Sequence, residues 1–185
     1  PSYSPMVVSA DSIKKEDPDS KVVFIGPCIS KKLEAEDEHV VDYVDYVITF
    51  EELAAIFVAA DIELTKIDQE VDINDASKYG RGYAKAGGVA EAIRTNIKKK
   101  YQEDIEIEKA DGLAACKKML KKAVKGKYDG HLLEGMACPG GCVGGPGTLI
   151  RINKATTQVN KFSDQSSYKT ADENQKLKKY EKENS

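Results

Sequence analysis

The sequence lacks the marks of several protein classes. None of its apolar runs approaches the ~20 residues that span a membrane as a helix, and no secretory signal is visible. Lysine and arginine number 28 against 31 aspartates and glutamates, which gives a net charge of −3. The lysines are mixed with carboxylates, and no basic stripe carries interleaved aromatic residues. We therefore expect neither a membrane nor a nucleic acid as a partner.

Histidine is scarce as well, with only His39 and His131 in the chain. The two are far apart, and neither has a second potential ligand at a metal-site spacing. We therefore expect both side chains at the surface or at strand ends. The length of 185 residues is enough to bury one hydrophobic core or two small ones.

The four cysteines are enough for two disulfides. Two of them, Cys138 and Cys142, are however four residues apart in a glycine-rich loop, and the chain is rich in lysine and glutamate. This combination favours thiolate ligation over disulfide formation. We therefore expect a reducing, cytoplasmic compartment.

The most informative stretch is the loop Glu134-Gly-Met-Ala-Cys-Pro-Gly-Gly-Cys-Val-Gly-Gly-Pro-Gly147. Its glycines allow positive φ and close approach of main-chain N–H groups, while its prolines stiffen the path. Thiolates on Cys138 and Cys142 are suited to iron, and neighbouring amides can hydrogen-bond to cluster sulfides. We therefore expect an iron–sulfur cluster. The alternatives are a glycine-rich turn with incidental cysteines and a structural zinc site, which the absence of paired Cys-x-x-Cys knuckles disfavours.

A third thiol, Cys28, follows an apolar run that ends at Gly26. This run predicts a buried strand over 21–25, with Cys28 just beyond its end. Open α/β sheets usually carry ligand sites beyond the carboxyl ends of their strands. Another strand is predicted at 132–133, before the Cys138 loop, so we expect the three cysteines to meet at one rim of the sheet.

The remaining patterns predict an α/β fold, in which short buried strands alternate with helices and neighbouring strands pair in parallel. Helices are expected over 6–16, from a capping box at 49–52 to about 60, and over 87–100, 112–125 and 154–162; further strands are expected at 43–48 and 105–109. The polar stretch 61–82 is interpreted as a long connecting loop. Residues 1–160 are expected to form the domain, and 161–185 a charged C-terminal helix or tail.

Three further positions have competing interpretations. Cys116 lies in mid-helix without ligand-like neighbours, so we interpret it as a small packing residue. The pair Gly87-Gly88 opens a helix, where its N–H groups would either face an anion or simply allow a tight entry turn. Glu91 would serve proton traffic or solvation, and we favour solvation.

Two cysteine motifs resemble the second and third signature motifs of the iron-only ([FeFe]) hydrogenase catalytic domain. They are Gly26-Pro-Cys28-Ile-Ser-Lys31-Lys-Leu-Glu34-Ala-Glu36 and Met136-Ala-Cys138-Pro-Gly-Gly-Cys142-Val-Gly-Gly. Between them, Gly87-Gly-Val-Ala-Glu-Ala-Ile-Arg94 is similar to the family's Gly-Gly-Val-Met-Glu-Ala segment. The order and spacing agree, and the similarity covers the chain from residue 4 to about 155.

The resemblance implies two α/β lobes, incomplete here, with an H-cluster in the cleft between them. In that family a [4Fe–4S] cubane takes four cysteines, and one of them bridges to a diiron subcluster. Carried onto this chain, the cubane ligands are Cys28, Cys138 and Cys142, with Cys142 as the bridge. The implied activity is reversible proton reduction and H2 oxidation, or H2 sensing.

The resemblance also implies roles for residues around the diiron unit. Lys31 would donate to a cyanide ligand, and a cationic donor is suited to offset the charge of a reduced cluster. Glu34 would lie on the proton route. Met136 and Pro5 would pack against the diiron unit.

The family's first motif, a Cys-Cys-Pro or Ser-Cys-Pro segment, is absent upstream of Ser4-Pro5-Met6. That motif supplies the fourth cubane cysteine, so we expect the chain, which begins at Pro1, to be an excised fragment that is inactive by itself. Expected partners are the remainder of its own chain with ferredoxin-like or signalling modules, a ferredoxin-like electron carrier, and the hydrogenase maturation proteins.

Three departures from the catalytic pattern lie near the expected cofactor. Gly26-Pro27-Cys28 stands where the family usually has Met-Pro-Cys, Gly144-Gly-Pro-Gly-Thr148 where it continues Gly-Gly-Gly-Gln-Pro, and Met6 where it often has glutamine. These changes point toward the sensory branch of the family. A second hypothesis is a non-enzymatic [4Fe–4S] redox sensor or scaffold. The presence of Met136 and Cys142 favours the first hypothesis.

Overall fold

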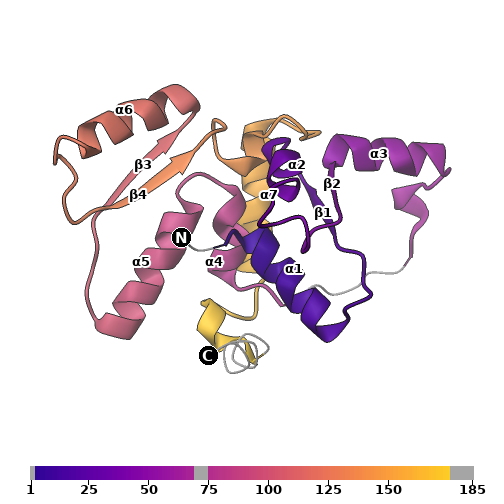
Figure 1. Ribbon diagram of the computed structural model, residues 1–185, viewed down its shortest axis with the longest axis horizontal. Coiled ribbons are helices and arrows are strands. Elements are labelled where there is room, and N and C mark those ends of the chain that lie inside the picture. Colours follow the sequence, from indigo (N-terminus) through magenta and orange to yellow (C-terminus); the bar gives the residue numbers. More distant parts are fainter. Residues whose placement is uncertain (1–2, 69–74, 176–185) are drawn as a thin grey trace. The chain divides into compact units, whose positions relative to one another are not determined.

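The computed structural model describes residues 3–68 and 75–175. These residues divide into two compact units, whose helices and strands are shown in Figure 1. Unit 1 is formed by 3–68 together with 145–149, and unit 2 by 75–144 together with 150–175. The chain thus leaves unit 2 after Gly144 and returns to it at Ile150. Two units, each with a short sheet, agree with the two-lobed α/β fold that the resemblance implied.

Unit 1 alternates helices with two short strands. Its elements are α1 (Pro5–Glu16), β1 (Val23–Gly26), α2 (Ser30–Ala35), β2 (Tyr46–Thr49), α3 (Phe50–Ala59) and a 3₁₀ turn at Leu64–Lys66. The capping box predicted for α3 is confirmed. The Thr49 hydroxyl accepts from the Glu52 N–H at 3.1 Å, and the Glu52 carboxylate accepts from the Thr49 N–H at 2.7 Å. The local sequence therefore sets the start of this helix.

The two strands of unit 1 pair in parallel, with Phe24 opposite Val47. Both of these side chains pack against the core. On the other face, Val23 and Ile25 are 45% and 43% exposed. The prediction of a buried strand was therefore wrong, because successive side chains point to opposite faces of a sheet and only one face is covered here.

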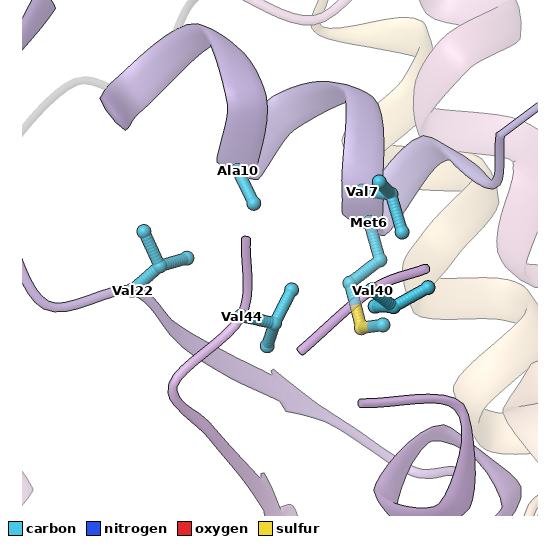
Figure 2. Close-up of a cluster of buried hydrophobic side chains, with 6 residues drawn as sticks. All are labelled: Met6, Val7, Ala10, Val22, Val40 and Val44. Atoms are coloured by element: carbon cyan, nitrogen blue, oxygen red, sulfur yellow. The ribbon is translucent and has the colours of Figure 1, made fainter. Parts of the chain in front are cut away.

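The core of unit 1 lies under α1, as Figure 2 shows. Its six buried side chains are at most 9% exposed and come from α1, from the residue before β1 and from the segment that precedes β2: Met6, Val7, Ala10, Val22, Val40 and Val44. The helix contributes positions i, i+1 and i+4, which together span an apolar arc of about 100°. This apolar face explains why the predicted helix forms and how it is held against the sheet.

Asp45 joins the end of α1 to the start of β1. Its carboxylate accepts from the Val22 N–H at 2.8 Å and pairs with Lys14 and Lys21, each at 3.0 Å. The hydrogen bond from Val22, followed by those from the two lysines, holds the pKa of Asp45 far below its usual value. Val22 is therefore held by the hydrogen bond from its N–H to Asp45 as well as by the packing of its side chain.

Unit 2 contains the second sheet. Its elements are α4 (Lys78–Arg81), a 3₁₀ turn at Gly82–Ala84, α5 (Gly88–Tyr101), β3 (Ile107–Asp111), α6 (Leu113–Ala123), β4 (Leu132–Met136), a 3₁₀ turn at Cys142–Gly144, α7 (Ile152–Asp164) and a 3₁₀ turn at Ala171–Glu173. β3 and β4 pair in parallel, and α6 is the helix that connects them. This β-α-β arrangement puts the ends of β3 and β4, and the loops after them, at the same edge of the sheet.

Arg81 connects α4 to α7 inside unit 2. It is only 8% exposed, and its guanidinium donates to the main-chain oxygens of Ala76 (3.1 Å) and Phe162 (2.8 Å). The same group stacks 4.0 Å above the centre of the Phe162 ring. A buried charge is tolerated here because its donors are used and an aromatic face covers it.

Several predicted boundaries shift. The strands expected at 43–48 and 105–109 form at Tyr46–Thr49 and Ile107–Asp111. The stretch 61–82 is not a plain loop, because it contains Leu64–Lys66 and Lys78–Arg81; residues 69–74 lie outside the described part. The boundary expected at residue 160 falls inside α7, and residues 176–185 of the tail expected at 161–185 lie outside the described residues. Within the described residues, no helix has the length and apolar character that crossing a membrane requires.

Candidate functional site

The cysteine loop of unit 2 begins where β4 ends at Met136. Cys138 follows two residues later, and Cys142 opens the 3₁₀ turn. Between them Gly140 and Gly141 have φ of 79° and 90°, a region that side chains rarely occupy. The Gly141 N–H donates to the Cys138 carbonyl at 3.0 Å and so closes a turn between the two cysteines. The glycines predicted to allow positive φ therefore do so.

This loop is held against neighbouring main chain. The Gly140 carbonyl accepts from the Ala86 N–H at 2.9 Å, and the Gly140 N–H donates to the Asp111 carboxylate at 2.5 Å. A Cβ on Gly141 would lie 2.4 Å from the nitrogen of Ala86, which leaves no room for any other residue. The path between Cys138 and Cys142 is thus fixed from β3 and from the segment before α5.

The amides of the loop are less available than the sequence suggested. The N–H groups of Gly140, Gly141 and Gly144 donate to the Asp111 carboxylate and to the carbonyls of Cys138 and Gly141. Each of these three donors is used to hold the turn. Hydrogen bonds from the loop amides to cluster sulfides stay a prediction.

Cys116 lies on α6, with its thiol against the main chain of β3 and β4. Its thiol is 3.4 Å from the Ala110 carbonyl and 3.3 Å from the Met136 carbonyl, distances at which it can donate to either. The side chain is half-buried, and a Cβ on Gly135 would lie 3.4 Å from its sulfur. These contacts agree with a packing role and place the thiol against the main chain that leads into the loop.

Cys28 is held in unit 1, between β1 and α2. The preceding residue, Pro27, accepts from the Gly147 N–H at 3.0 Å through its carbonyl oxygen. A Cβ on Gly147 would lie 2.6 Å from the Thr49 Cβ, so only glycine allows this approach. The segment that follows the cysteine loop in sequence is thereby attached next to Cys28.

Lys31 and Glu34 form an ion pair on α2. The ammonium lies 2.5 Å from Glu34 Oε2, and the other carboxylate oxygen accepts from the hydroxyl of Ser4. Partial burial pushes the pKa of Glu34 upward, but the hydrogen bonds from Lys31 and Ser4 outweigh it and leave the pKa below its usual value. Glu34 is therefore a carboxylate at neutral pH, and Lys31 already has an anionic partner within its own helix.

The two remaining predicted residues occupy element ends. Pro5 is the first residue of α1, where its missing N–H costs nothing, and its side chain is exposed. Met136 is the last residue of β4, and its carbonyl accepts from the Gly112 N–H at 2.9 Å. The main chain at both residues is thus held by secondary structure.

Sequence reasoning missed the role of Glu134. Its side chain is 7% exposed and accepts from the N–H groups of Gly87 and of Ala90, the latter at 2.7 Å. The anion that faces the start of α5 is thus a carboxylate of the protein itself. Gly87 has φ of 84°, so the glycine pair also provides the tight entry turn. Glu91 is exposed, which agrees with solvation.

The predicted site residues fall into two groups. Pro5, Cys28, Lys31 and Glu34 belong to unit 1, whereas Met136, Cys138 and Cys142 belong to unit 2. Across residues 3–68 and 75–175, no three His, Cys, Asp or Glu side chains gather into a metal-binding group. None of the four cysteines takes part in a disulfide. A single site with all three predicted cysteine ligands therefore stays a prediction.

His39 and His131 lie where they were expected. The side chain of His39 is 75% exposed. His131 directly precedes β4, and the centre of its ring lies 5.8 Å from that of the Tyr128 ring, with the two planes tilted by 55°. Neither is near a cysteine in sequence, and neither belongs to a metal-binding group in the described chain.

Comparison with known proteins identifies the family. The profile of the iron only hydrogenase large subunit, C-terminal domain, matches residues 1–146. The chain belongs to this family. The match includes every site residue named above, from Pro5 to Cys142.

Two hydrogenases and one protein of another description are among the relatives. Iron hydrogenase 1 of Clostridium pasteurianum is 31% identical over 70% of this chain, and the NADP-reducing hydrogenase subunit HndD of Solidesulfovibrio fructosivorans is 32% identical over 75%. The nuclear prelamin A recognition factor of Homo sapiens is 29% identical over 68%. These matches cover 29%, 30% and 35% of the respective relatives, so the chain spans about a third of their length or less.

Solved structures confirm the fold. A structure of HydA(deltaEFG), described as revealing stepwise [FeFe]-hydrogenase H-cluster assembly, aligns with a TM-score of 0.63 and 26% identity. It covers 94% of this chain, which in turn covers 61% of that one. The [FeFe]-hydrogenase HydA1 of Chlamydomonas reinhardtii aligns with a TM-score of 0.64 at 24% identity, which shows similarity of fold alone.

Proposed function

We propose that this chain is the H-cluster-binding part of an [FeFe]-hydrogenase-like protein of the cytoplasm. The observation that carries the proposal is the loop between Cys138 and Cys142, where two thiols flank a turn of two positive-φ glycines with no side chains between them except that of Pro139. Thiolates are the ligands of iron–sulfur clusters, so the donor set fits the group. Membership of the family supports the same conclusion.

In this proposal Cys28, Cys138 and Cys142 hold a [4Fe–4S] cluster, and Cys142 also bridges to a diiron subcluster. When bound, this cofactor supplies electron storage and the site at which protons and H2 interconvert. The fourth cubane cysteine would come from a further segment of the protein that carries this chain. The thiols at 138 and 142 are held by the turn described above, which limits how far the two ligands can separate.

Chain connectivity supports the joint use of the three cysteines. Cys142 and Gly147 are five residues apart, and five extended residues span at most about 18 Å. Gly147 in turn donates to Pro27, the neighbour of Cys28. The covalent chain therefore ties one loop to the other, whatever orientation the two units adopt.

Lys31, Glu34, Pro5 and Met136 would serve the diiron part. Glu34 would lie on the proton route, with the Ser4 hydroxyl as its hydrogen-bond partner. Its lowered pKa keeps it ionised at neutral pH, so it would hold a proton only in passing. Lys31 has donors beyond the one used on Glu34, because an ammonium carries three, and one of them would reach a cyanide ligand. Pro5 and Met136 would exclude water beside the cofactor.

The experiment is infrared spectroscopy of the protein that carries this chain, co-expressed with the hydrogenase maturation proteins. Bands from iron-bound CO and cyanide support the proposal, and Cys142→Ser should abolish them while Cys116→Ala leaves them in place. Iron without such bands would contradict the H-cluster and favour a cubane alone. H2 uptake or evolution with a ferredoxin-like carrier then separates turnover from sensing.

The second candidate is a non-enzymatic [4Fe–4S] redox sensor or scaffold. It is favoured by Gly26 and by Gly144–Thr148, which depart from the catalytic pattern, and by similarity to the nuclear prelamin A recognition factor, which is not described as a hydrogenase. This candidate predicts iron and sulfide in equal amounts, no CO or cyanide bands, and no H2 chemistry.

A further inference from the structure

A cavity of about 540 Å³ lies within unit 2, away from the predicted cluster ligands. Its walls come from α4, the 3₁₀ turn after it, the start of α5, β3 and the end of α7, and its polar lining includes Lys78, Lys85, Glu91, Lys109, Asn160 and Ser163. None of the site residues assigned above lines it. Its volume is within the range of small-molecule sites.

Two of the three lysines in this cavity have no carboxylate partner. Lys78 pairs with Asp164 at 2.7 Å, which compensates its charge. Lys85 makes no ion pair with any described residue and donates to the Asn160 side-chain oxygen at 2.5 Å, although its charge helps to lower the pKa of the nearby Asp164. Lys109 makes no ion pair with any described residue, and its ammonium would lie 2.9 Å from a Cβ placed on Gly87. The cavity therefore holds two ammonium groups that form no ion pair with a described residue.

The start of α5 offers no further binding group for an anion. Its N–H groups at Gly87 and Ala90 are satisfied by Glu134, so the helix terminus carries its own anion. Glu91 lines the cavity but makes no ion pair in the described chain. An anionic ligand would thus meet the ammonium groups of Lys85 and Lys109 and, against them, the one carboxylate of Glu91.

Ser163 gives an independent indication. It lines the cavity, is 4% exposed, and has the one buried side-chain oxygen in the described residues without a hydrogen-bond partner. A buried hydroxyl without a partner is costly and rare in folded proteins. Rotation about its single side-chain torsion redirects this hydroxyl at little cost. A ligand oxygen in the cavity would satisfy it.

We infer that this cavity binds a small anion that carries phosphate or several carboxylates. Lys85 and Lys109 would neutralise its charge, and Ser163 would donate a hydrogen bond. Charge-assisted contacts from ammonium groups to such oxygens are strong and specific for anions. The site lies beside the cysteine loop, because the residue after Lys85, Ala86, donates to Gly140. A bound anion would therefore hold the segment that supports the loop, a consequence that rests on the proposed function.

The test is calorimetric titration of the whole chain with inorganic phosphate, pyrophosphate and citrate, with chloride at matched ionic strength as the reference. The expected result is saturable binding of one anion per chain by at least one of the three. Tighter binding of the phosphates identifies a phosphate site, and tighter binding of citrate a polycarboxylate site. Binding no different from the effect of chloride would overturn the inference.

Variants locate the site. Lys109→Gln and Lys85→Gln should each weaken binding about tenfold, because each removes one charged hydrogen-bond donor. Ser163→Ala should weaken it less, without loss of thermal stability, because the hydroxyl has no partner to lose. Lys121→Gln, an exposed lysine on α6, is the matched control. Equal weakening in the control would show diffuse charge attraction and overturn the site.

Amide exchange tests the link to the loop. Anion binding should slow hydrogen exchange at the Ala86 N–H, which donates to Gly140. The same titration that saturates calorimetrically should saturate this protection. Binding with unchanged exchange at Ala86 would overturn the link to the loop. It would contradict neither the anion site nor the proposed cluster.

Discussion

The ammonium of Lys31 lies 2.5 Å from Glu34 Oε2, three residues further along α2. The two residues that the family resemblance assigned to separate roles are therefore partners of each other. Lys31 stabilises the ionised form of Glu34, and Glu34 in turn occupies one of the N–H donors of the Lys31 ammonium. In the proposed proton route, the basicity of Glu34 would therefore depend on Lys31.

Lys31→Met should raise the pKa of Glu34, since it removes the strongest of the contacts that lower it. Carbon-detected NMR titration of the Glu34 carboxyl measures this directly. Lys32→Met is the matched control, because Lys32 pairs at 2.5 Å with Glu52 and holds the pKa of that carboxyl at about 2. The control should raise the pKa of Glu52 and leave that of Glu34 unchanged. A Glu34 pKa that does not respond to Lys31→Met would show that the pair does not exist in solution.

Asp45→Asn should destabilise unit 1 and remove part of its acid sensitivity. The folded-state pKa of Asp45 is depressed, so its contribution is fully present above the unfolded pKa of about 3.9 and is lost as the pH falls toward the folded-state value. Urea midpoints across pH 2 to 7 measure this. The exposed Asp42→Asn should leave the profile unchanged, and an identical profile for Asp45→Asn would contradict the network.

Glu134→Gln should loosen the start of α5. The substitution removes the charge on a buried acceptor of two main-chain N–H groups, a change expected to cost about 1–3 kcal/mol. Faster hydrogen exchange at Ala90 and a lower denaturation midpoint are the readouts. Glu91→Gln, at an exposed position in the same helix, should cost under about 0.5 kcal/mol. Similar losses in both variants would mean that α5 responds to net charge rather than to this cap.

Gly141→Ala should disrupt the cysteine loop although every thiol remains. The new Cβ would be forced within 2.4 Å of the Ala86 nitrogen at a φ of 90°. Gly130→Ala has a similar φ of 78° but open space around it, so it should cost only the backbone strain of about 1–2 kcal/mol. Thermal denaturation compares the two. If Gly141→Ala were as mild as Gly130→Ala, the packing of the loop against the segment before α5 would be refuted.

Local patterns predicted much of the fold. The helix from Pro5, the capping box at Thr49 and the helix from Gly88 depend on neighbours in sequence, and all three form. The exposure of Val23 and Ile25 was not predictable in this way. A short apolar run shows that a strand forms, but its burial depends on what covers each face of the sheet.

The candidate site was likewise predictable from the sequence only in part. The loop at 138–142 was recognisable because its cysteines and glycines are adjacent in sequence. The pairing of Lys31 with Glu34 was also within reach, since residues three apart on a helix are neighbours. The contact of Glu134 with Gly87 joins residues 47 positions apart, and only tertiary structure shows it. The same holds for Asp45 with Lys14.

The most direct test of the central claim is the iron bound by the chain after anaerobic reconstitution with iron, sulfide and an external thiol. Iron and EPR signal should be retained in Cys116→Ser and lost in Cys28→Ser, Cys138→Ser and Cys142→Ser. This outcome would establish that cysteines from both units ligate one cluster. Full iron retention in Cys28→Ser, or loss in Cys116→Ser equal to that in Cys138→Ser, would contradict the assignment of the ligands.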